Sequence, residues 1–363
     1  MPAPDARSSD ARTAGRPPDD LPGSSSGSRT MHDVPPRRSS TAPTYLGIDL
    51  GATKIEVVVT GADLTPLSRA RAATPARGGP PAVVTAIEAA VAEALATASH
   101  GRLVAAGIGV PGHVDRATGA VARSPNIRGW TASYPLQAEL ETRLGVPVAV
   151  DNDVRTALLG EHRLGAAAPY HDVLAVWFGT GVGGALLLDG MIRRGRLDAC
   201  GEIGHACATP GGRRCACGRR GCLEAYAGRS SMERRARERV DKGDKTTLFT
   251  LMRKAARTRL TSGVIARALD QGDLLANELI NDAVRAAGPV IASAVNILDV
   301  DAVVIGGGLG TRLGQPFSRR IHRAMQPHLL HDGRASVTVL SAGLGDLSGA
   351  LGGVVLASER APG

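Results

Sequence analysis

Three cysteines and one histidine in the middle of the chain have a spacing typical of a metal site. His205 is followed by Cys215, Cys217 and Cys222. One imidazole and three thiolates form a donor set typical of closed tetrahedral zinc sites. The residues between these cysteines are mainly Gly and Arg, so the loop buries little apolar surface and a metal ion would fix its shape. We therefore predict a structural Zn²⁺ site, with Cys207 as a competing ligand candidate.

Two glutamates flank this cysteine-rich loop. Glu202 lies three residues before His205, and Glu224 lies two residues after Cys222. A metal-ordered loop would hold both carboxylates rigidly, and carboxylates accept hydrogen bonds from the paired hydroxyls of a sugar. The pattern favours a polyhydroxyl ligand, although either glutamate taken alone could equally be a surface charge.

A first glycine turn, Asp49 to Lys54, has the composition of a phosphate loop. Gly51 lets backbone N–H groups approach phosphate oxygens closely, and Thr53 and Lys54 add hydroxyl and ammonium donors. Asp49 could hold the waters around a Mg²⁺ ion, which keeps much of its hydration beside nucleotide phosphates. A hairpin with a charged tip would have the same residues, so this turn alone leaves both interpretations open.

A second glycine turn runs from Gly179 to Gly184 and matches G-x-G-x-x-G. A dinucleotide-binding fold requires a helix after this motif. A short apolar strand follows instead, so we predict a hairpin in which Gly179, Thr180 and Gly181 cover phosphates with backbone amides.

A third glycine turn follows the strand that we expect at 302–305. Gly307 and Gly308 could lie against the adenine or ribose of a nucleotide. The alternative is a strand-to-helix turn that needs a positive φ. Three such turns in one chain favour nucleotide binding more than any one of them does.

A candidate catalytic base lies where a strand ends and a helix begins. Asp153 follows Asn152 there, and an Asp or Asn at such a junction is often only a helix N-cap. In a kinase, however, a carboxylate takes the proton of the acceptor hydroxyl. We assign that role to Asp153, and the binding of sugar hydroxyls to Asn152 and Asn126.

The elements that position these residues form a repeated pattern. Strand–turn–strand units are expected at 46–60 and 174–190, which suggests a duplicated α/β plan with similar loops facing across a cleft. Residues 1–43 are rich in Pro, Ser, Gly, Asp and Arg, and we expect them to be disordered. Further strands are expected at 103–110, 146–150, 302–305 and 337–340, and helices at 80–98, 135–144, 154–164, within 229–300 and at 346–358.

Composition limits the class of protein. The chain has 363 residues, of which 43% are hydrophobic and 2% aromatic. The low aromatic content argues against a reader of single-stranded nucleic acid. No run of 18 apolar residues and no signal-type apolar segment are present, and clustered cysteines favour a metal over disulfides. We expect a cytoplasmic protein that binds neither membrane nor nucleic acid.

The net charge of +9 comes from one stretch. Residues 211–260 hold 15 Lys or Arg against five Asp or Glu. One interpretation is a solvated helical face, and the other is a field that attracts an anionic substrate such as a nucleotide.

These motifs together resemble the ROK family of bacterial sugar kinases and repressors, over about residues 44–360. The resemblance is carried by Asp49-Leu-Gly-Ala-Thr-Lys54, Asn152-Asp153, Gly179-Thr-Gly-Val-Gly-Gly184, Gly201-Glu-Ile-Gly-His205, Cys215-Ala-Cys-Gly218 with Gly221-Cys-Leu-Glu224, and Val304-Ile-Gly-Gly-Gly308. It implies the actin/hexokinase-like (ribonuclease H-like) fold. The small domain would span 44–155 and be completed by a helix in 345–363, and the large domain would span 156–344 and carry the zinc loop.

The resemblance also implies an ATP- and Mg²⁺-dependent kinase that is usually a homodimer or homotetramer. Asp153 would be the base, and His205 would bind both zinc and sugar. The residues implied in sugar binding are Asn126, Asn152, Asp153, Glu202, His205 and Glu224. Val154 and Arg155 depart from the Ala-Asn that often continues the Asn-Asp motif, which could alter substrate choice.

The sequence does not identify the acceptor sugar. Glucose is the default, and fructose, an N-acylmannosamine or an amino-hexose such as kanosamine is the alternative. The basic stretch would suit polyphosphate as donor, whereas the third glycine turn favours a nucleotide. A sugar-responsive ROK repressor is the alternative from another class; it would carry a winged helix ahead of Asp49, and no helical periodicity is present there.

Overall fold

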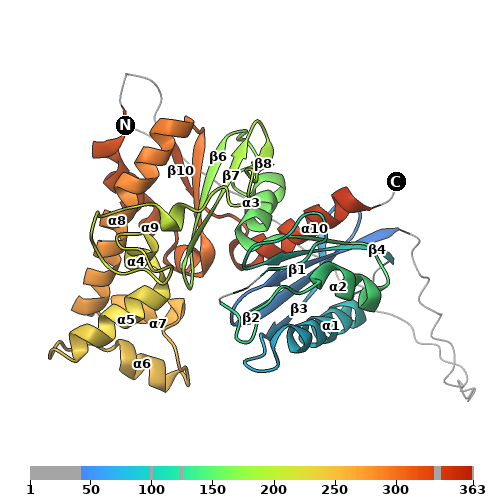
Figure 1. Cartoon of the computed structure of the whole chain (residues 1–363), viewed down its shortest axis with the longest axis horizontal. Coiled ribbons are helices and arrows are strands. Elements are labelled where there is room, and N and C mark those ends of the chain that lie inside the picture. The colour runs from blue at the N-terminus through green and yellow to red at the C-terminus, as the bar shows by residue number, and fades with distance from the viewer. Residues whose placement is uncertain (1–41, 99–100, 123, 125, 331–336, 362–363) are drawn as a thin grey trace, which may run out of the picture. The chain divides into compact units, whose positions relative to one another are not determined.

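The computed structural model describes residues 42–98, 101–122, 124, 126–330 and 337–361 (Figure 1). The expectation of a disordered extension over residues 1–43 falls almost wholly outside this part of the chain. From Pro43 onward, strands and helices build two five-stranded mixed sheets.

The first sheet has the strand order β3-β2-β1-β4-β5. Its strands are β1 (Pro43–Leu50), β2 (Lys54–Thr60), β3 (Pro66–Ala73), β4 (Arg102–Val110) and β5 (Val148–Asn152). The first three strands are antiparallel neighbours, whereas β4 and β5 extend the sheet in parallel from β1. Since parallel strands end at the same edge of a sheet, Asp49 at the end of β1 and Asp153 just after β5 lie at one edge.

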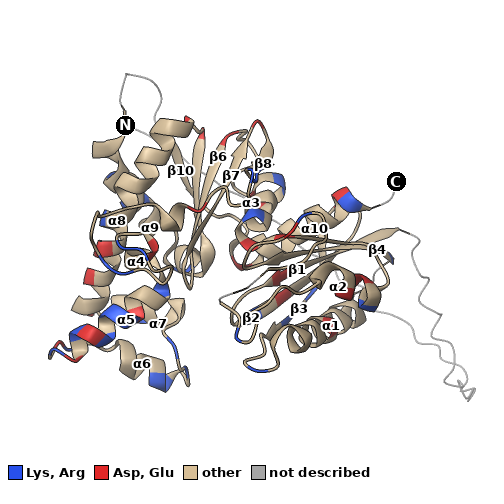
Figure 2. Cartoon of the chain, in the orientation of Figure 1, with Lys and Arg blue, Asp and Glu red and all other residues tan. Residues whose placement is uncertain are grey.

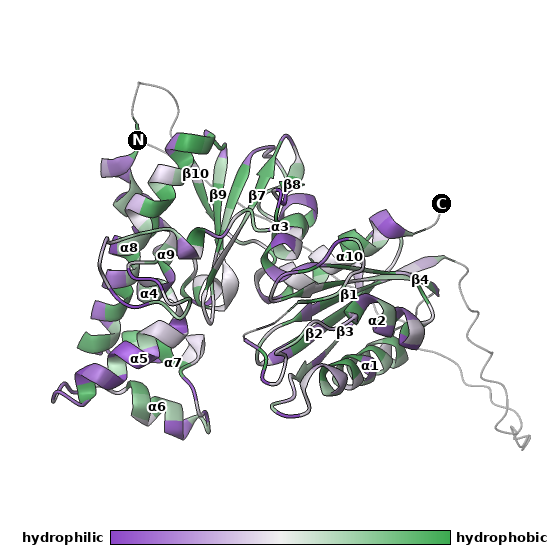
Figure 3. Ribbon diagram, viewed as in Figure 1, coloured by the Kyte–Doolittle hydropathy of each residue, from purple (hydrophilic) through white to green (hydrophobic). Residues whose placement is uncertain are grey.

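The second sheet repeats this plan with the order β10-β9-β6-β7-β8. Its strands are β6 (Val173–Phe178), β7 (Val182–Leu188), β8 (Met191–Arg193), β9 (Ala302–Gly306) and β10 (Thr338–Ser341). Again three antiparallel strands are followed by two that are parallel to the first. The duplicated α/β plan is therefore confirmed, and in Figure 3 both sheets are largely apolar.

Ten α-helices and three short 3-10 helices are present among the described residues. The α-helices are α1 (Gly79–Thr97), α2 (Leu136–Leu144), α3 (Asp153–Leu164), α4 (Glu224–Ala227), α5 (Arg229–Val240), α6 (Leu248–Lys254), α7 (Ser262–Asp270), α8 (Leu274–Leu298), α9 (Gly307–Met325) and α10 (Ser348–Arg360). By length and composition alone, α1 could cross a membrane, and it is the one described helix that could. Its residues Val83, Ile87 and Val91 belong to the core of the first sheet, which accounts for its apolar character.

The helix at the end of the described chain returns to the first sheet. α10 packs on β1 and β4 and along α3, all of which are distant from it in the sequence. This packing is compatible with a small domain completed by the C-terminal helix. The domain boundaries at 155/156 and 344/345 stay predictions.

Candidate active site

A cavity of about 410 Å³ contains the predicted sugar and phosphate residues. Every one of them lines it: Asp49, Gly51, Thr53, Lys54, Asn126, Asn152, Asp153, Gly179, Thr180, Gly181, Glu202, His205, Glu224, Gly307 and Gly308. Asp49 and Asn152 lie at the carboxyl ends of β1 and β5, and Gly179 and Gly307 directly follow β6 and β9, which is where α/β sheets bind ligands. Glu202, His205 and Glu224 come from the segments that flank the cysteine-rich loop. The cavity can therefore hold a polyhydroxyl group and a phosphate group at the same time.

The start of α3 places two polar side chains, Asn152 and Asp153, in the cavity wall. Asn152 is the N-cap, because its Oδ1 accepts hydrogen bonds from the backbone N–H of Val154 at 3.0 Å and of Arg155 at 3.3 Å. Its Nδ2 donates to the Gly112 carbonyl at 3.4 Å. Asp153 Oδ1 also accepts a hydrogen bond from the Val154 N–H at 3.0 Å, and the Asp153 carboxylate lines the cavity.

The carboxyl groups of Asp153 and Asp49 are unusually weak acids. Burial, with a smaller contribution from the negative charge of Glu202, raises the pKa of Asp153 to about 6, although a hydrogen bond from the Val154 backbone N–H acts in the opposite direction. Burial, followed by the charge of Asp153, raises the pKa of Asp49 to about 7. Both carboxylates would be stabilised by a cation or by the donor groups of a ligand in the cavity.

The first glycine turn is a tight hairpin between β1 and β2. The backbone N–H of Gly51 donates to the Lys54 carbonyl at 2.8 Å, and Thr74 Oγ1 donates to the Gly51 carbonyl at 2.7 Å. Lys54 Nζ lies 3.5 Å from Glu56 and 3.6 Å from Asp346. The ammonium is thus held beside the cavity by acidic partners on two sides.

The second glycine turn connects β6 and β7 as the predicted hairpin. Glu224 Oε2 accepts a hydrogen bond from the Val182 backbone N–H at 3.0 Å. This bond connects the end of the cysteine-rich loop to the second glycine turn. The third turn is a strand-to-helix junction, because α9 begins at Gly307 directly after β9. Gly307 has a φ of 78°, and a Cβ there would lie 2.6 Å from the Phe178 carbonyl oxygen, so only glycine fits.

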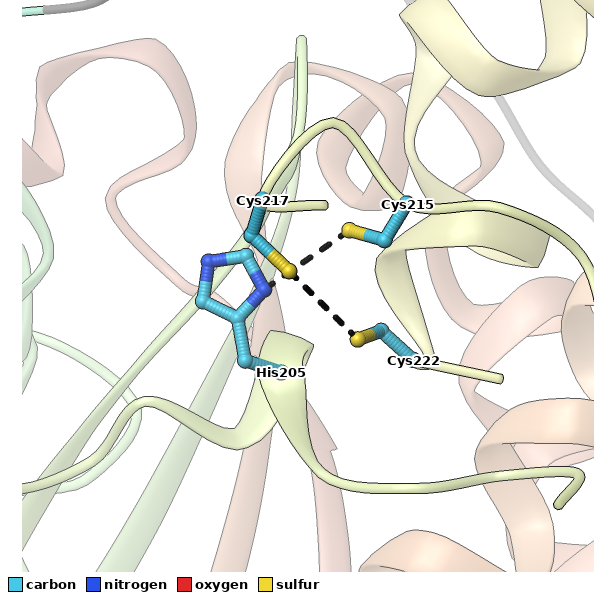
Figure 4. A group of neighbouring side chains, drawn as sticks. All are labelled: His205, Cys215, Cys217 and Cys222. Atoms are coloured by element: carbon cyan, nitrogen blue, oxygen red, sulfur yellow. Dashed lines mark hydrogen bonds between the residues drawn. The ribbon is translucent and has the colours of Figure 1, made fainter. Parts of the chain in front are cut away.

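The cysteine-rich loop brings its four predicted ligands together. One ligand atom each from His205, Cys215, Cys217 and Cys222 lies within 4.8 Å of the other three (Figure 4). Cys217 Sγ and Cys222 Sγ are 3.7 Å apart, and Cys215 Sγ is 3.8 Å from His205 Nδ1. Thiolates on a tetrahedral zinc ion at about 2.3 Å are roughly 3.8 Å apart, so the donor set and its spacing fit zinc. Cys207 lies outside this cluster.

An ion network connects α3 to the segment that leads into Glu202. Arg155 Nε donates to Asp151 at 2.7 Å, and its Nη2 donates to Asp198 at 2.6 Å. Arg155 Nη1 also donates to the Asp198 carbonyl at 3.0 Å, and Arg194 pairs with Asp151. The side chains of Arg155, Asp151 and Asp198 are only 5%, 8% and 11% exposed. The departure at Arg155 noted in the sequence is therefore part of a buried clamp.

Two charged residues of the cavity wall were not predicted from the sequence. Arg229, the first residue of α5, donates to Thr180 Oγ1 at 2.9 Å and to Ser262 Oγ at 3.0 Å. Asp346 pairs with Lys54 from the turn before α10. Neither residue lies in a recognisable motif, and the only sequence signal for Arg229 is its place within the basic stretch 211–260.

The model of the ROK family matches residues 45–360. The chain belongs to the ROK family. The glucokinase of Streptomyces coelicolor is 32% identical to this ROK protein over 319 residues, which cover 87% of the chain and 98% of that enzyme. The N-acetylmannosamine kinase of Escherichia coli O127:H6 is 30% identical over 314 residues, which cover 86% of the chain and 98% of that enzyme.

The solved structures include a ROK family glucokinase from Streptomyces griseus in complex with glucose and AMPPNP. It is 33% identical, has a TM-score of 0.76, and is matched over 87% of this chain and 99% of that one. This ROK protein accordingly has the actin/hexokinase-like fold and is an ATP-dependent sugar kinase that acts on hexoses. The finer questions concern the sugar, the metals and the residues that perform the transfer.

Proposed function

We propose that this kinase transfers the γ-phosphoryl group of ATP to glucose, forming glucose 6-phosphate, with Asp153 as general base. The observation that supports this most is a carboxylate with a pKa of about 6 in a cavity that it shares with three glycine turns. Such a group is ionised at neutral pH yet basic enough to take a hydroxyl proton in the transition state. The Streptomyces glucokinases support glucose as the acceptor.

The proposed sugar contacts come from both sides of Asp153. Glu202 and Glu224 would accept hydrogen bonds from sugar hydroxyls, and the amide of Asn126 could both accept and donate them. Asn152 uses its Oδ1 as a helix cap, so we assign the second N–H of its amide to the sugar. These contacts would hold one hydroxyl against Asp153 and in line with the phosphoryl group, which is most of what phosphoryl transfer needs.

The proposed phosphate contacts are backbone amides of the glycine turns, with Thr53, Thr180 and Lys54. Asp49 fits a Mg²⁺ site, because a nearby cation would stabilise the ionised form of a half-buried carboxylate whose pKa is about 7. Bound Mg²⁺ would neutralise charge on the phosphates. The chain's own residues then orient the phosphoryl group and keep the proton acceptor at Asp153.

We assign the cysteine cluster to a structural zinc ion held by His205, Cys215, Cys217 and Cys222. His205 lies both in this cluster and in the cavity wall. Zinc would therefore fix the imidazole and both flanking glutamates without taking part in the transfer.

An N-acylmannosamine is the second candidate acceptor, because an N-acetylmannosamine kinase is a relative at 30% identity. Fructose and kanosamine follow. Coupled measurement of ADP release across a panel of hexoses at equal concentration separates these sugars. We expect glucose to have the highest kcat/KM, and a higher value for any other sugar would reject it.

The role of Asp153 is tested by Asp153→Ala. We expect kcat to fall at least about 10²-fold, the low end for loss of a general base, with sugar and ATP binding broadly retained in calorimetric titration. Near-wild-type turnover would reject the role.

We further propose a cytoplasmic homodimer or homotetramer with small and large domains divided at 155/156. All five cysteines are free of disulfides, which suits a reducing compartment. Light scattering of the purified chain would give the oligomeric state.

A further inference from the structure

The base of the cysteine-rich loop is a short antiparallel ladder. Cys207 and Cys222 lie opposite each other in it as an isolated bridge. The residue after each cysteine donates its N–H to the carbonyl of the residue before the other cysteine, at 2.7 Å and 3.0 Å. Because these hydrogen bonds flank the two cysteines and do not join them, Cys207 and Cys222 form a non-hydrogen-bonded pair.

This kind of pair brings two side chains within reach of a disulfide bond. Its Cα atoms are about 4.5 Å apart, and both side chains project from the same face of the ladder. A disulfide requires Cα atoms roughly 4.4–6.8 Å apart. Cys207 Sγ lies 3.4 Å from the point that a Cβ on Gly221 would occupy, directly beside Cys222. Rotation about the Cα–Cβ bond of Cys207, whose side chain is exposed, can therefore bring the two sulfur atoms together.

The two cysteines differ in accessibility and in their other contacts. Cys207 is exposed and lies outside the four-residue cluster, whereas Cys222 is only 2% exposed and belongs to it. A dissolved oxidant therefore reaches the sulfur of Cys207 more readily than that of Cys222. The pair thus combines an accessible thiol that has no ligand role with a neighbour that the proposed zinc site needs.

We propose that Cys207 is a redox-active residue that forms a disulfide with Cys222 under hydrogen peroxide and thereby releases zinc. The proposal rests on the zinc site assigned above. The Cys207 sulfur attacks one peroxide oxygen, the O–O bond breaks, and the thiol proton leaves with the departing hydroxide as water. The Cys222 thiolate then attacks the sulfur of the sulfenic acid, and its S–O bond breaks. The hydroxide that leaves takes a proton from solvent, so two sulfurs lose two electrons and one peroxide becomes two waters.

Loss of this ligand would reach the active-site cavity. A zinc ion left with His205, Cys215 and Cys217 has three protein ligands in place of four and is held more weakly. Cys215 Sγ lies 3.6 Å from Glu224 Oε1, and Glu224 Oε2 accepts the hydrogen bond from the second glycine turn. Oxidation would therefore free His205 and Glu224 from their fixed positions and weaken sugar binding. A thiol reductant and Zn²⁺ would restore both.

Tryptic peptides separate this disulfide from the alternatives. Figure 2 shows blue segments beside α4, and the arginines of the loop divide its cysteines among three peptides. Cys207 falls in residues 197–213, Cys215 and Cys217 fall in 215–219, and Cys222 falls in 221–229. After treatment of the zinc-loaded protein with hydrogen peroxide, mass spectrometry should find 197–213 linked to 221–229. A chromogenic chelator should detect release of about one equivalent of zinc, which dithiothreitol and added Zn²⁺ reverse.

Cys207→Ser is the decisive variant, and Cys200→Ser is the matched control. Cys200 also lies outside the cluster and shares the tryptic peptide of Cys207. Wild type and Cys200→Ser should lose zinc and show a higher sugar KM after peroxide, whereas Cys207→Ser should keep both its zinc and its KM.

The proposal is overturned if peroxide links residues 215–219 to 221–229, or if Cys207→Ser loses zinc as fast as wild type. These results would show that the zinc ligands oxidise without Cys207. A disulfide that releases zinc but leaves the sugar KM unchanged would instead contradict the role that the proposed function gives to zinc.

Discussion

At the scale of single residues, Asp153 combines two properties that a proton acceptor needs. Asn152 is the N-cap of α3, and the carboxylate of Asp153 lines the cavity. Burial raises the pKa of this carboxylate to about 6. A free aspartate, with a pKa near 4, would be a much weaker base. In the proposed mechanism, Asn152 caps the helix and Asp153 takes the proton.

The pH profile follows from this pKa. Asp153 must be ionised to accept a proton, so kcat/KM should fall as the pH drops through about 6 and approach a tenfold loss per pH unit below it. Because the charge of Glu202 raises this pKa, Glu202→Gln should move the acidic limb to lower pH. Glu93→Gln, on the exposed face of α1, should leave it in place. An acidic limb that does not move in Glu202→Gln would show that another group controls it.

At the scale of elements, the cysteine-rich loop has almost no core of its own. Only Cys215, Cys222 and Ala225 form its buried apolar cluster, with Tyr226 against them. In the proposed zinc site, metal ligation would replace hydrophobic burial in fixing His205.

Removal of one thiolate tests this dependence. Cys217→Ser should release zinc and raise KM for the sugar, because Glu202, His205 and Glu224 lose their fixed positions. Plasma mass spectrometry of the purified protein gives the zinc content, and initial rates give KM. Cys207→Ser is the control, since Cys207 lies outside the four-residue cluster. Loss of zinc without any change in sugar KM would mean that the metal does not shape the sugar site.

The clamp from α3 to the segment before Glu202 makes a separate prediction. Asp198→Asn should raise the sugar KM several-fold and the ATP KM little, because a hydrogen bond to a charged group contributes about 1.5–3 kcal/mol and this one anchors the segment that leads into Glu202. Asn also tolerates the positive φ of 54° at this position.

Asp189→Asn is a close control for the clamp. Asp189 has a φ of 53° and pairs with Arg193 at 2.6 Å, but its side chain is 78% exposed. If Asp198→Asn lowers the melting temperature but leaves the sugar KM unchanged, the clamp stabilises the fold without positioning Glu202.

The sequence predicts the elements that carry their own signal and misses those that depend on a partner. Strands rich in Val, Ile and Leu were found within a few residues, whereas β3 and β8 were not predicted. Both are edge strands, and β3 has one fully buried side chain, Ala70, so hydrogen bonds to β2 rather than composition define it. Likewise, Arg229 and Asp346 reach the cavity only because the topology brings α5 and the turn before α10 there.

At the scale of the whole molecule, α3 and α10 connect the repeated sheets. α3 contacts β6 and β7 of the second sheet, and α10 packs on β1 and β4 of the first. Glu161 of α3 is fully buried and accepts hydrogen bonds from the backbone of Gly343 at 2.8 Å and from Ser348 Oγ at 2.7 Å. The helix pair is therefore a shared structural support, and its packing should control the stability of the described fold.

Gly352 lies where α10 and α3 approach most closely. A Cβ there would be 1.7 Å from the Thr156 carbonyl oxygen, a backbone atom that cannot rotate away. Gly352→Ala should therefore separate the helices and lower the free energy of unfolding by about 1–3 kcal/mol or more, although alanine favours helices. Gly310→Ala in α9 is the control, because its Cβ would meet Ile305 at an ordinary 3.5 Å. Calorimetric unfolding should show a lower melting temperature for Gly352→Ala alone; equal melting temperatures would mean that the two helices can move apart without loss, and that the sheets are held together elsewhere.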